Sequence, residues 1–498
     1  MNNNDYSYQS EDRSTQKSKV ISGLSWKFAE RIVTQVIAFL VQIVLARILL
    51  PEHYGRIAIV TVFIAIANVF VTAGLSTALV QKKDADNLDF SSIFYGNILF
   101  SLVLYCLLFF AAPLISSFYN IPELSPVLRV LALQIPISAL HSVQQAFVSR
   151  RMDFKRYFWS SLFGTLVSGV VGIWMAYEGF GLWAIVAQHL TDLFIDTVVL
   201  WFTAKWRPVL KFSFSRWKVL ASYGWKIMLS TLIDNIYTQL RSLLIGKFYT
   251  ESDLAHYNKG QTFPQLVVTN VNLSISSVLF PAVSRAQNDK DRVKAITRRS
   301  IRVSSYIIWP LMAGLAAVST PLIRLMLTEK WLFCVPYLQI ACFTFGLMPI
   351  HTANLEAIKA VGRSDLFLRL EIIKKLVGVA AIAMSLPFGV MPLALSSIIV
   401  SLLSSFINAY PNRKLLDYSY FEQLKDILPG FAASVVMAIP VYLLQYLKLN
   451  DWFTLALQVV SGLLLYVLIS IVFRMDSFRY ILTSVREFIA AHHKTKQN

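Results

Sequence analysis

The sequence predicts an all-α, polytopic membrane protein with about 14 transmembrane helices. Of its 498 residues, 56% are hydrophobic and 15% are charged, whereas soluble proteins average about 25% charged residues. The charged residues leave long gaps, several of them as long as the roughly 20 apolar residues that cross a bilayer. These observations exclude a soluble enzyme, a disordered chain and a secreted disulfide scaffold.

The uncharged runs give most of the helices in order. No Asp, Glu, Lys or Arg occurs in 57–81, 90–122, 130–149, 157–177, 260–284, 303–323, 331–355, 376–412, 427–447 and 452–473. The run from 376 is too long for one span, and we expect Pro387, Gly389 and Pro392 to break it into two. Three further spans with internal charges are expected near 21–49, 180–204 and 222–247.

The net charge of +18 indicates how the chain is oriented. If the N-terminus is cytoplasmic, most Lys and Arg outside the helices fall in inner loops and tails, and the outer loops hold Lys330 and Lys448. Both termini are therefore expected in the cytoplasm. Nucleic-acid binding, the other common reason for a basic chain, is disfavoured.

The two halves of the chain resemble each other. Helices that begin near Trp26 and Trp225 each end in a basic residue, and a short outer loop, a tyrosine and a second basic residue follow. An even number of helices separates the copies, which predicts a parallel repeat with a pseudo-two-fold axis along the membrane normal. The expected division is a disordered cytoplasmic tail (1–19), an N-lobe of six helices (20–210), a C-lobe of six (211–412), a C-terminal helix pair (413–474) and a cytoplasmic tail (475–498).

Several cations fall where the positive-inside rule disfavours them. A cavity between two lobes that is lined by cations would suit an anionic substrate, because Arg and Lys both bind phosphate. The alternatives are snorkelling to the lipid headgroups and local pairing, Arg47 with Glu52 and Lys247 with Glu251. The candidate substrate-binding cations are Arg31, Arg47, Arg56, Arg241, Lys247 and Lys259.

Acidic residues inside predicted helices form a second candidate set, because ionisable groups in a membrane are costly and often functional. Asp234 and Arg241, seven residues apart, share one helix face and could form a cavity wall or a structural ion pair. In the span predicted at 180–204, Asp192 and Asp196 lie one turn apart with His189 nearby. These groups could relay protons or hold a coupling ion, or the acids could pair with Arg or Lys of a neighbouring helix.

The sequence contains no enzyme motif that we recognise. His-Glu-x-x-His, Gly-x-Ser-x-Gly, a phosphate-binding loop and Gly-x-Gly-x-x-Gly are all missing, and the outer loops are too short to hold a catalytic domain. The three cysteines have no zinc or redox spacing. We therefore expect neither an enzyme nor a bound metal or cofactor.

Several segments resemble bacterial polysaccharide transporters. The stretch from Leu45 to Gly55 is similar to their helix 1–2 signature, and Gly181 to Gln188 is similar to the start of their helix 6. The stretches 245–261 and 278–284 resemble their helix 7–8 region, except that Lys259-Gly260 replaces the usual Arg-Ala. The resemblance covers about 20–480 and places the chain in the multidrug/oligosaccharidyl-lipid/polysaccharide exporter superfamily.

The resemblance implies a flippase that moves undecaprenyl-diphosphate-linked repeat units across the bacterial inner membrane by alternating access, for lipopolysaccharide, exopolysaccharide or capsule synthesis. The implied partners are the lipid-linked oligosaccharide, membrane lipid, a glycan polymerase and glycosyltransferases, with no nucleic acid. The C-terminal helix pair (413–474) would line a path for the lipid tail. The alternatives are an ion-coupled exporter of small drugs in the same superfamily, a scaffold in a glycan assembly complex, and a glycan ligase or polymerase, which the short outer loops disfavour.

Overall fold

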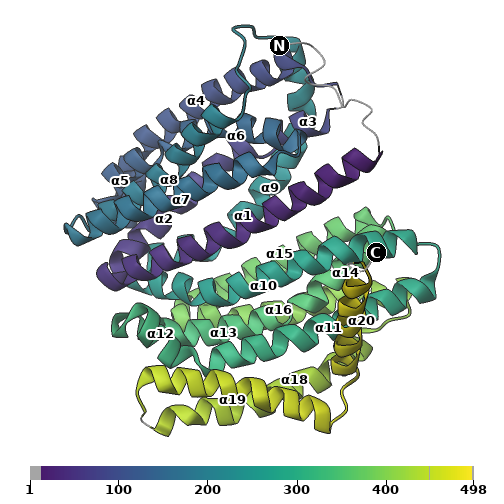
Figure 1. The fold of residues 1–498 in the computed structure, drawn as a ribbon. Coiled ribbons are helices and arrows are strands. Elements are labelled where there is room, and N and C mark those ends of the chain that lie inside the picture. Colours follow the sequence, from purple (N-terminus) through teal and green to yellow (C-terminus); the bar gives the residue numbers. More distant parts are fainter. Residues whose placement is uncertain (1–12, 83, 448, 496–498) are drawn as a thin grey trace. The chain divides into compact units, whose positions relative to one another are not determined.

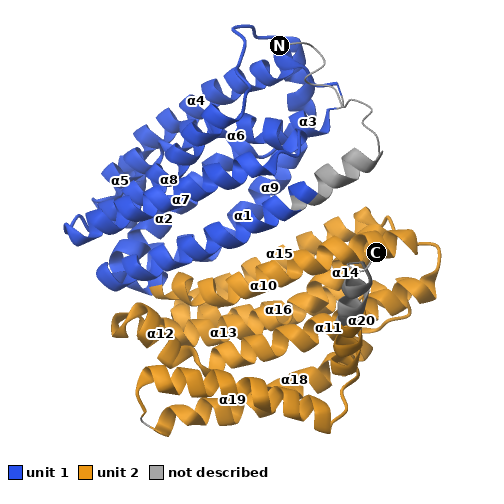
Figure 2. Cartoon of the chain, in the orientation of Figure 1, with its two compact units in different colours: residues 1–255 blue, residues 256–498 orange. Residues whose placement is uncertain are grey.

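The computed structural model describes residues 13–82, 84–447 and 449–495, and every regular element in these ranges is a helix (Figure 1). The helices form two compact units, residues 1–255 and 256–498 (Figure 2). The chain passes from one unit to the other inside a single helix. Each unit is described separately below.

The helix bounds follow the uncharged runs of the sequence. Unit 1 contains α1 (Arg13–Ile48), α2 (Pro51–Thr72), α3 (Leu75–Gln81), α4 (Asn87–Tyr119), α5 (Leu124–Leu131), α6 (Gln134–Arg150), α7 (Phe154–Tyr177), α8 (Leu182–Thr203) and α9 (Phe214–Phe248). Unit 2 contains nearly all of α10 (Glu251–Arg285), and then α11 (Lys290–Ala317), α12 (Ser319–Leu327), α13 (Val335–Gly346), α14 (Met348–Ala360), α15 (Ser364–Ser385), α16 (Val390–Ala409), α17 (Asn412–Leu415), α18 (Tyr420–Leu443), α19 (Asp451–Val472) and α20 (Asp476–Thr495). Short 3₁₀ helices occupy Glu329–Cys334, Leu386–Phe388 and Leu444–Leu447.

The chain is a multi-pass membrane protein. Within the described residues, 11 helices are long and apolar enough to cross a bilayer, and 12 if α11 and α12, bent by 67° at their junction, form one span. α9 and α15 occupy two more predicted spans, but charged and polar residues keep them from meeting the same criterion. The predicted count of 14 is therefore not confirmed. The predicted break near Pro387 is confirmed, since a 3₁₀ turn ends at Gly389 with φ +115°.

Small residues position the helices that carry the polar groups of unit 1. α7 buries a small side chain at every fourth position: Ser160, Gly164, Ser168, Gly172 and Ala176. A Cβ on Gly164 would lie 2.9 Å from the Asp192 carbonyl oxygen, so α8 can approach this closely only because the position is glycine. The stripe therefore brings the acidic side chains of α8 against α7.

α9 packs at its two ends within unit 1. Near its start, a Cβ on Gly224 would lie 2.8 Å from the Gly74 carbonyl carbon, just before α3. Near its end, Gly246 packs on Ile59 of α2. The chain thus divides after Ala255, whereas the sequence repeat assigns this helix to a C-lobe that begins at residue 211. The repeat-based lobes stay a prediction.

Unit 2 has its own core around α11 and α18. Trp309 of α11 packs edge-on against Phe431 of α18 with ring centroids 4.6 Å apart, in a buried cluster that includes Ile301, Ile350 and Tyr418. α19 joins through Tyr466, whose hydroxyl donates to the Tyr306 carbonyl oxygen. These contacts fix the C-terminal helix pair onto α11.

The two predicted tails contain helix. α1 begins at Arg13, inside the segment 1–19 that we expected to be a disordered tail, and residues 1–12 lie outside the described part of the chain. α20 occupies most of the predicted tail 475–498. Its sequence places Phe478, Ile481 and Leu482 at helical spacing between charged residues, which is the pattern of an amphipathic helix.

Candidate functional site

The middle of α9 carries exposed polar side chains. The helix buries Leu220 and Gly224 at one end and Ser242, Ile245 and Gly246 at the other, and nothing between them. The exposed side chains of this middle part include Ser230, Asp234 and Thr238, and half-buried Arg241 continues the same face. The predicted pairing of Asp234 and Arg241 on one face therefore agrees with the helix. Both residues make further interactions of their own.

α10 carries a comparable stripe in unit 2. Gln261, Gln265, Thr269, Asn272 and Ser276 are spaced by four, four, three and four residues, so they form one face of the helix. Gln265 and Thr269 on this face are exposed, and the Asn272 side-chain oxygen accepts a 3.1 Å hydrogen bond from Thr352 of α14. This stripe is not among the site residues predicted from the sequence. The four-residue spacing of amides and hydroxyls was the available signal.

The position of these polar residues along their helices limits what can surround them in a membrane. α9 packs along α2 and α4, and both of these helices meet the criterion for a span, as does α10. Exposed amide, hydroxyl and charged groups in the middle of such helices would be costly against lipid tails, so they face water, substrate or another protein surface. Each unit therefore offers a polar surface at membrane depth.

A cluster of acidic residues lies inside unit 1, between α7 and α8. The Ser168 hydroxyl of α7 donates a 3.2 Å hydrogen bond to the Asp192 carboxylate. One turn along α8, Asp196 faces His141 of α6, with 3.9 Å between its Oδ2 and the histidine Nε2. These two side chains are only 15% and 10% exposed. No Lys or Arg of the described residues forms an ion pair with either aspartate, and the charged partner that faces Asp196 is the His141 imidazole.

The hydrogen bonding of this cluster is incomplete. A separation of 3.9 Å is an electrostatic contact and too long for a hydrogen bond. In the described part of the chain, Asp196 Oδ1 and His141 Nδ1 are buried and have no hydrogen-bond partner. Buried polar atoms are nearly always satisfied, so such a pair indicates a site that can gain or lose a proton or bind a small ion.

The cluster continues to the first helix. Tyr157 of α7 accepts a 3.1 Å hydrogen bond from Gln145 of α6, and the Lys27 ammonium of α1 lies 3.9 Å from the centre of the same ring. Lys27 also forms a 2.9 Å ion pair with Glu30, which is 8% exposed. Four helices of unit 1 thus surround one set of titratable groups. We call Glu30, His141, Asp192 and Asp196 the acid cluster.

Two of the predicted substrate-binding cations are held by other residues at the end of unit 1 where α2 begins and α9 ends. Arg56 of α2 pairs with Glu123 and with Glu251, the latter at 3.5 Å. Lys247 of α9 donates to the Phe118 carbonyl oxygen and lies 4.2 Å from the centre of the Phe118 ring. Local pairing was the alternative expectation, and it occurs with different partners, since Glu251 pairs with Arg56.

The other predicted site residues occupy separate environments. Lys259 is 8% exposed in unit 2, with its ammonium 5.6 Å from the centre of the Trp331 ring. Arg47 is exposed near the end of α1, and Arg31 is half-buried on the same helix. His189 is exposed on α8 and makes no hydrogen bond or ion pair with another described residue. The structure therefore brings Asp192 and Asp196 together and leaves His189 out.

With this geometry in place, comparison with known proteins identifies the family. A family model described as polysaccharide biosynthesis protein matches residues 44–336, which is more than half of the chain. The chain belongs to this family. The matched region includes the acid cluster except Glu30, the polar face of α9 and the stripe of α10, so these features belong to a polysaccharide biosynthesis protein.

Curated relatives of this polysaccharide biosynthesis protein carry names from several bacterial glycans. It is 24% identical to the succinoglycan biosynthesis transport protein ExoT of Rhizobium meliloti, over 73% of this chain and 74% of the relative. It is 22% identical to the lipopolysaccharide biosynthesis protein WzxC of Escherichia coli, over 86% of each. It is 25% identical to the teichuronic acid biosynthesis protein TuaB of Bacillus subtilis, over 60% of this chain and 62% of the relative.

Solved structures share the fold of this family member. The lipid II flippase MurJ in an inward closed conformation matches with a TM-score of 0.75 and 16% identity, over 91% of this chain and 99% of that one. An inward-facing multidrug transporter of the MATE family and MOP superfamily matches with a TM-score of 0.60 and 14% identity, over 77% of this chain and 96% of that one. At these identities the likeness shows the fold alone.

Proposed function

We propose that this protein is a flippase, and not an enzyme, that moves lipid-diphosphate-linked polysaccharide repeat units across the bacterial cytoplasmic membrane by alternating access. Its family, the transport protein among its relatives and its fold support this function. The observation that carries it is the exposed polar face of α9, because a glycan and a diphosphate cannot cross hydrocarbon without polar partners. Undecaprenyl diphosphate is the proposed lipid carrier.

The arrangement of charges supports cytoplasmic termini and an inner-membrane location. Cytoplasmic loops of bacterial inner-membrane proteins carry the excess of Lys and Arg, and the loops assigned to that side carry it here. Substrate would then reach the protein from the side where glycosyltransferases work, and a glycan polymerase would take it on the other side. These enzymes are the proposed partners in the membrane.

Within this function, Arg241 is the cation that we assign to the substrate diphosphate. Arg56 lies near the start of α2, Lys247 lies in the last turn of α9, and Lys259 lies buried beside Trp331, so none of them lies in the middle of α9. Arg241 lies on the polar face of α9, whose middle part packs against no core. Arg31 and Arg47 stay weaker candidates on α1. A planar guanidinium can bind diphosphate oxygens through two parallel hydrogen bonds.

The acid cluster is the proposed coupling site. Two aspartates one turn apart in a low-dielectric site repel each other when both are charged, and a proton or small cation on the pair removes that cost. Binding and release of that ion could then drive the change between inward-open and outward-open states. Asp234, exposed on α9, stays a separate candidate.

An ion-coupled exporter of small cationic drugs is the second candidate function, because the fold also matches a multidrug transporter. The acid cluster would favour a cationic substrate if it bound the substrate directly. A membrane scaffold in a glycan assembly complex is a third reading, and it predicts that neither Arg241 nor the acid cluster is needed for export.

The test is export of surface glycan in a strain that lacks its own copy of this protein. We expect Arg241→Gln to lower glycan per membrane-inserted protein at least tenfold and to leave lipid-linked repeat units in the inner leaflet. Arg241→Lys should keep part of the activity, since it retains charge and loses the two-bond geometry. The matched control is Arg324→Gln, because Arg324 is held by Asp451 at 3.1 Å in unit 2. Wild-type export by Arg241→Gln would contradict the assignment.

A further inference from the structure

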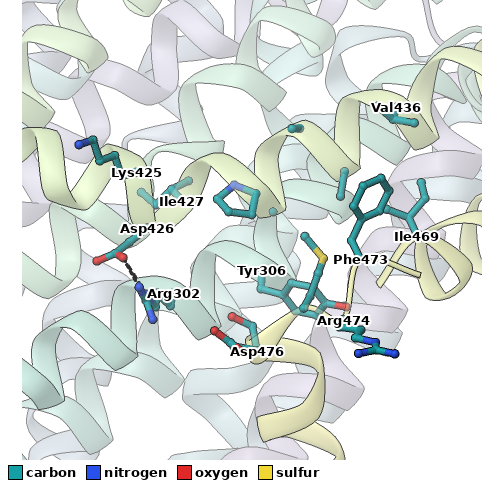
Figure 3. Close-up of a pocket in the computed structure, with 16 residues that line it drawn as sticks. Arg302, Tyr306, Lys425, Asp426, Ile427, Val436, Ile469, Phe473, Arg474 and Asp476 are labelled. Carbon is teal, nitrogen blue, oxygen red and sulfur yellow. Dashed lines mark hydrogen bonds and ion pairs between the residues drawn. The ribbon is translucent and has the colours of Figure 1, made fainter. Parts of the chain in front are cut away.

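A pocket of about 490 Å³ lies within unit 2, between α11, α18, α19 and the start of α20 (Figure 3). Its lining combines three basic side chains, Arg302, Lys425 and Arg474, with apolar ones. Figure 3 shows Lys425 and Asp426 at one end of the group and Ile469 and Phe473 at the other. Neither the polar face of α9 nor the polar stripe of α10 contributes a residue to it.

The backbone of α18 and α19 makes room for this pocket. α18 presents Pro429, Gly430, Ala432 and Ala433 toward it, and these residues fill little volume. A Cβ on Gly430 would lie in ordinary van der Waals contact with Tyr306 Cα of α11, at 3.6 Å, so α18 packs on α11 at this edge of the pocket. α19 ends at Val472, and the turn at Arg474 leads directly into α20, which closes one side.

The charges at the pocket are unbalanced. Asp426 binds Arg298 and Arg302 together, and the Tyr418 hydroxyl donates to it at 2.8 Å, so its charge is already used. Lys425 and Arg474 are exposed and form no ion pair with another described residue. The remaining acid of the lining, Asp476, offsets one of them. The pocket therefore keeps surplus positive charge for an anionic group.

The apolar part of the pocket could bind a hydrocarbon group attached to the anion. Val436, Ile469 and Phe473 offer hydrocarbon surface beside the cations. In the proposed orientation this end of unit 2 lies at the cytoplasmic membrane surface, and α20 runs across the spans rather than along them (Figure 1). Amphipathic helices with Lys and Arg in this position bind the anionic inner leaflet.

We infer that this pocket is a binding site for an anionic glycerophospholipid of the inner leaflet. The phosphate lies on the Arg474 side of the pocket, and one acyl chain packs on Val436 and Phe473. Lys425, at the other end of the group in Figure 3, adds to the positive charge of the lining. The bound lipid is a resident of the protein and is not transported. This inference rests on the proposed orientation in the membrane and is independent of the transported substrate.

The test is native mass spectrometry of the full-length protein with phosphatidylglycerol added stepwise. We expect wild-type protein to retain one phosphatidylglycerol more tightly than phosphatidylcholine. The double variant Lys425→Gln with Arg474→Gln should weaken phosphatidylglycerol binding about tenfold, since each cation near a lipid surface adds to the attraction. Ala433→Leu, which fills the pocket and leaves its charges, should also reduce binding. The matched control is Lys414→Gln, which removes an exposed lysine of α17 outside the pocket.

Three results would overturn the inference. One is equal retention of both phospholipids by wild-type protein, and another is no difference between the double variant and Lys414→Gln. The third is preferential displacement of phosphatidylglycerol from the pocket by polyprenyl diphosphate, which would assign the pocket to the substrate. Glycan export measured in the same variants separates this result from a failure of the proposed function.

Discussion

The two units bury polar networks of different chemistry. In unit 2, Asn354, Gln423 and Asn412 are fully buried and bind one another: Asn354 donates to Gln423 at 2.7 Å and accepts from both other amides. In unit 1, the acid cluster contains carboxylates and an imidazole instead, and Asp196 and His141 each retain an unbonded atom. Amides cannot change charge at any physiological pH, whereas carboxylates and imidazole can.

The two networks differ in whether they can change charge. A neutral, mutually bonded network stabilises one arrangement of α14, α17 and α18 and has no second state to reach. Even so, the Asn412 side-chain oxygen lacks a partner among the described residues, so an unbonded atom alone does not mark function. The functional signal in unit 1 is the combination of unbonded atoms with groups that titrate.

The largest expected effect is the loss of glycan export when a carboxylate of the acid cluster is replaced. Asp196→Asn keeps the shape of the side chain and removes its ability to exchange a proton. We expect glycan export per inserted protein to fall at least tenfold, with the melting temperature unchanged or raised, because a buried charge is removed. Asp192→Asn should have a similar effect. Thr203→Val on the same helix, whose hydroxyl bonds only its own helix, is the control. Normal export by both Asp variants would make the cluster structural.

The second effect concerns the amide network of unit 2, whose loss should lower stability and leave export unchanged. Asn354→Leu leaves Gln423 and Asn412 without their shared partner, and each buried unsatisfied amide costs about 1–3 kcal/mol. We expect the melting temperature in detergent to fall by several degrees, while export per folded molecule stays close to wild type. A specific loss of export with unchanged melting would show that the amide network also has a functional role.

A smaller effect on stability concerns Arg56, which pairs with two carboxylates where α2 begins. Arg56→Gln should lower the melting temperature slightly, since a partly exposed ion pair contributes at most about 1 kcal/mol. Export should fall much less than in Arg241→Gln. Exchanging the charges, with Arg56→Glu and Glu251→Arg together, should restore only part of the melting temperature, because Glu123 would then face a second carboxylate. If Arg56→Gln abolishes export in well-folded protein, Arg56 belongs to the substrate site after all.

The smallest effect is a pH dependence at the predicted cytoplasmic end of unit 1. Burial raises the pKa of Asp86, but hydrogen bonds from Arg216 and from the Asp89 backbone outweigh it, so the pKa lies below its ordinary value of 3.8. A lowered folded pKa means that the stabilisation is complete above the unfolded value and is lost as the pH falls below it. The melting-temperature difference between wild type and Arg216→Gln should therefore be constant at neutral pH and shrink below about pH 4. A constant difference at all pH values would exclude this ion pair as its cause.

The features that could be predicted from the sequence are those that depend on one helix alone. Uncharged runs gave the spans, Pro387 and Gly389 gave the break before α16, and a seven-residue spacing placed Asp234 and Arg241 on one face. These features depend on local periodicity, which needs no knowledge of neighbouring helices. The polar stripe of α10 was equally local and was overlooked because its residues are uncharged.

The features that the sequence could not predict depend on which helices touch. Nothing in one sequence names His141 of α6 as the residue that faces Asp196 of α8. One sequence also does not show that Glu251 pairs with Arg56 and not with Lys247, which is closer to it along the chain. α9 packs on α2 at Gly246 and beside Gly74, just before α3, at Gly224, because these glycines permit close approach, and one sequence does not show which helices they meet.

The central claim is that the protein moves a lipid-linked glycan between leaflets. The most direct measurement uses proteoliposomes that contain purified protein and a radiolabelled undecaprenyl-diphosphate-linked oligosaccharide, with a membrane-impermeant glycosidase added outside. Wild-type protein should make nearly all of the labelled glycan accessible to the glycosidase, and Arg241→Gln should leave close to half protected in the inner leaflet. If wild-type vesicles protect as much glycan as protein-free vesicles, the account is contradicted.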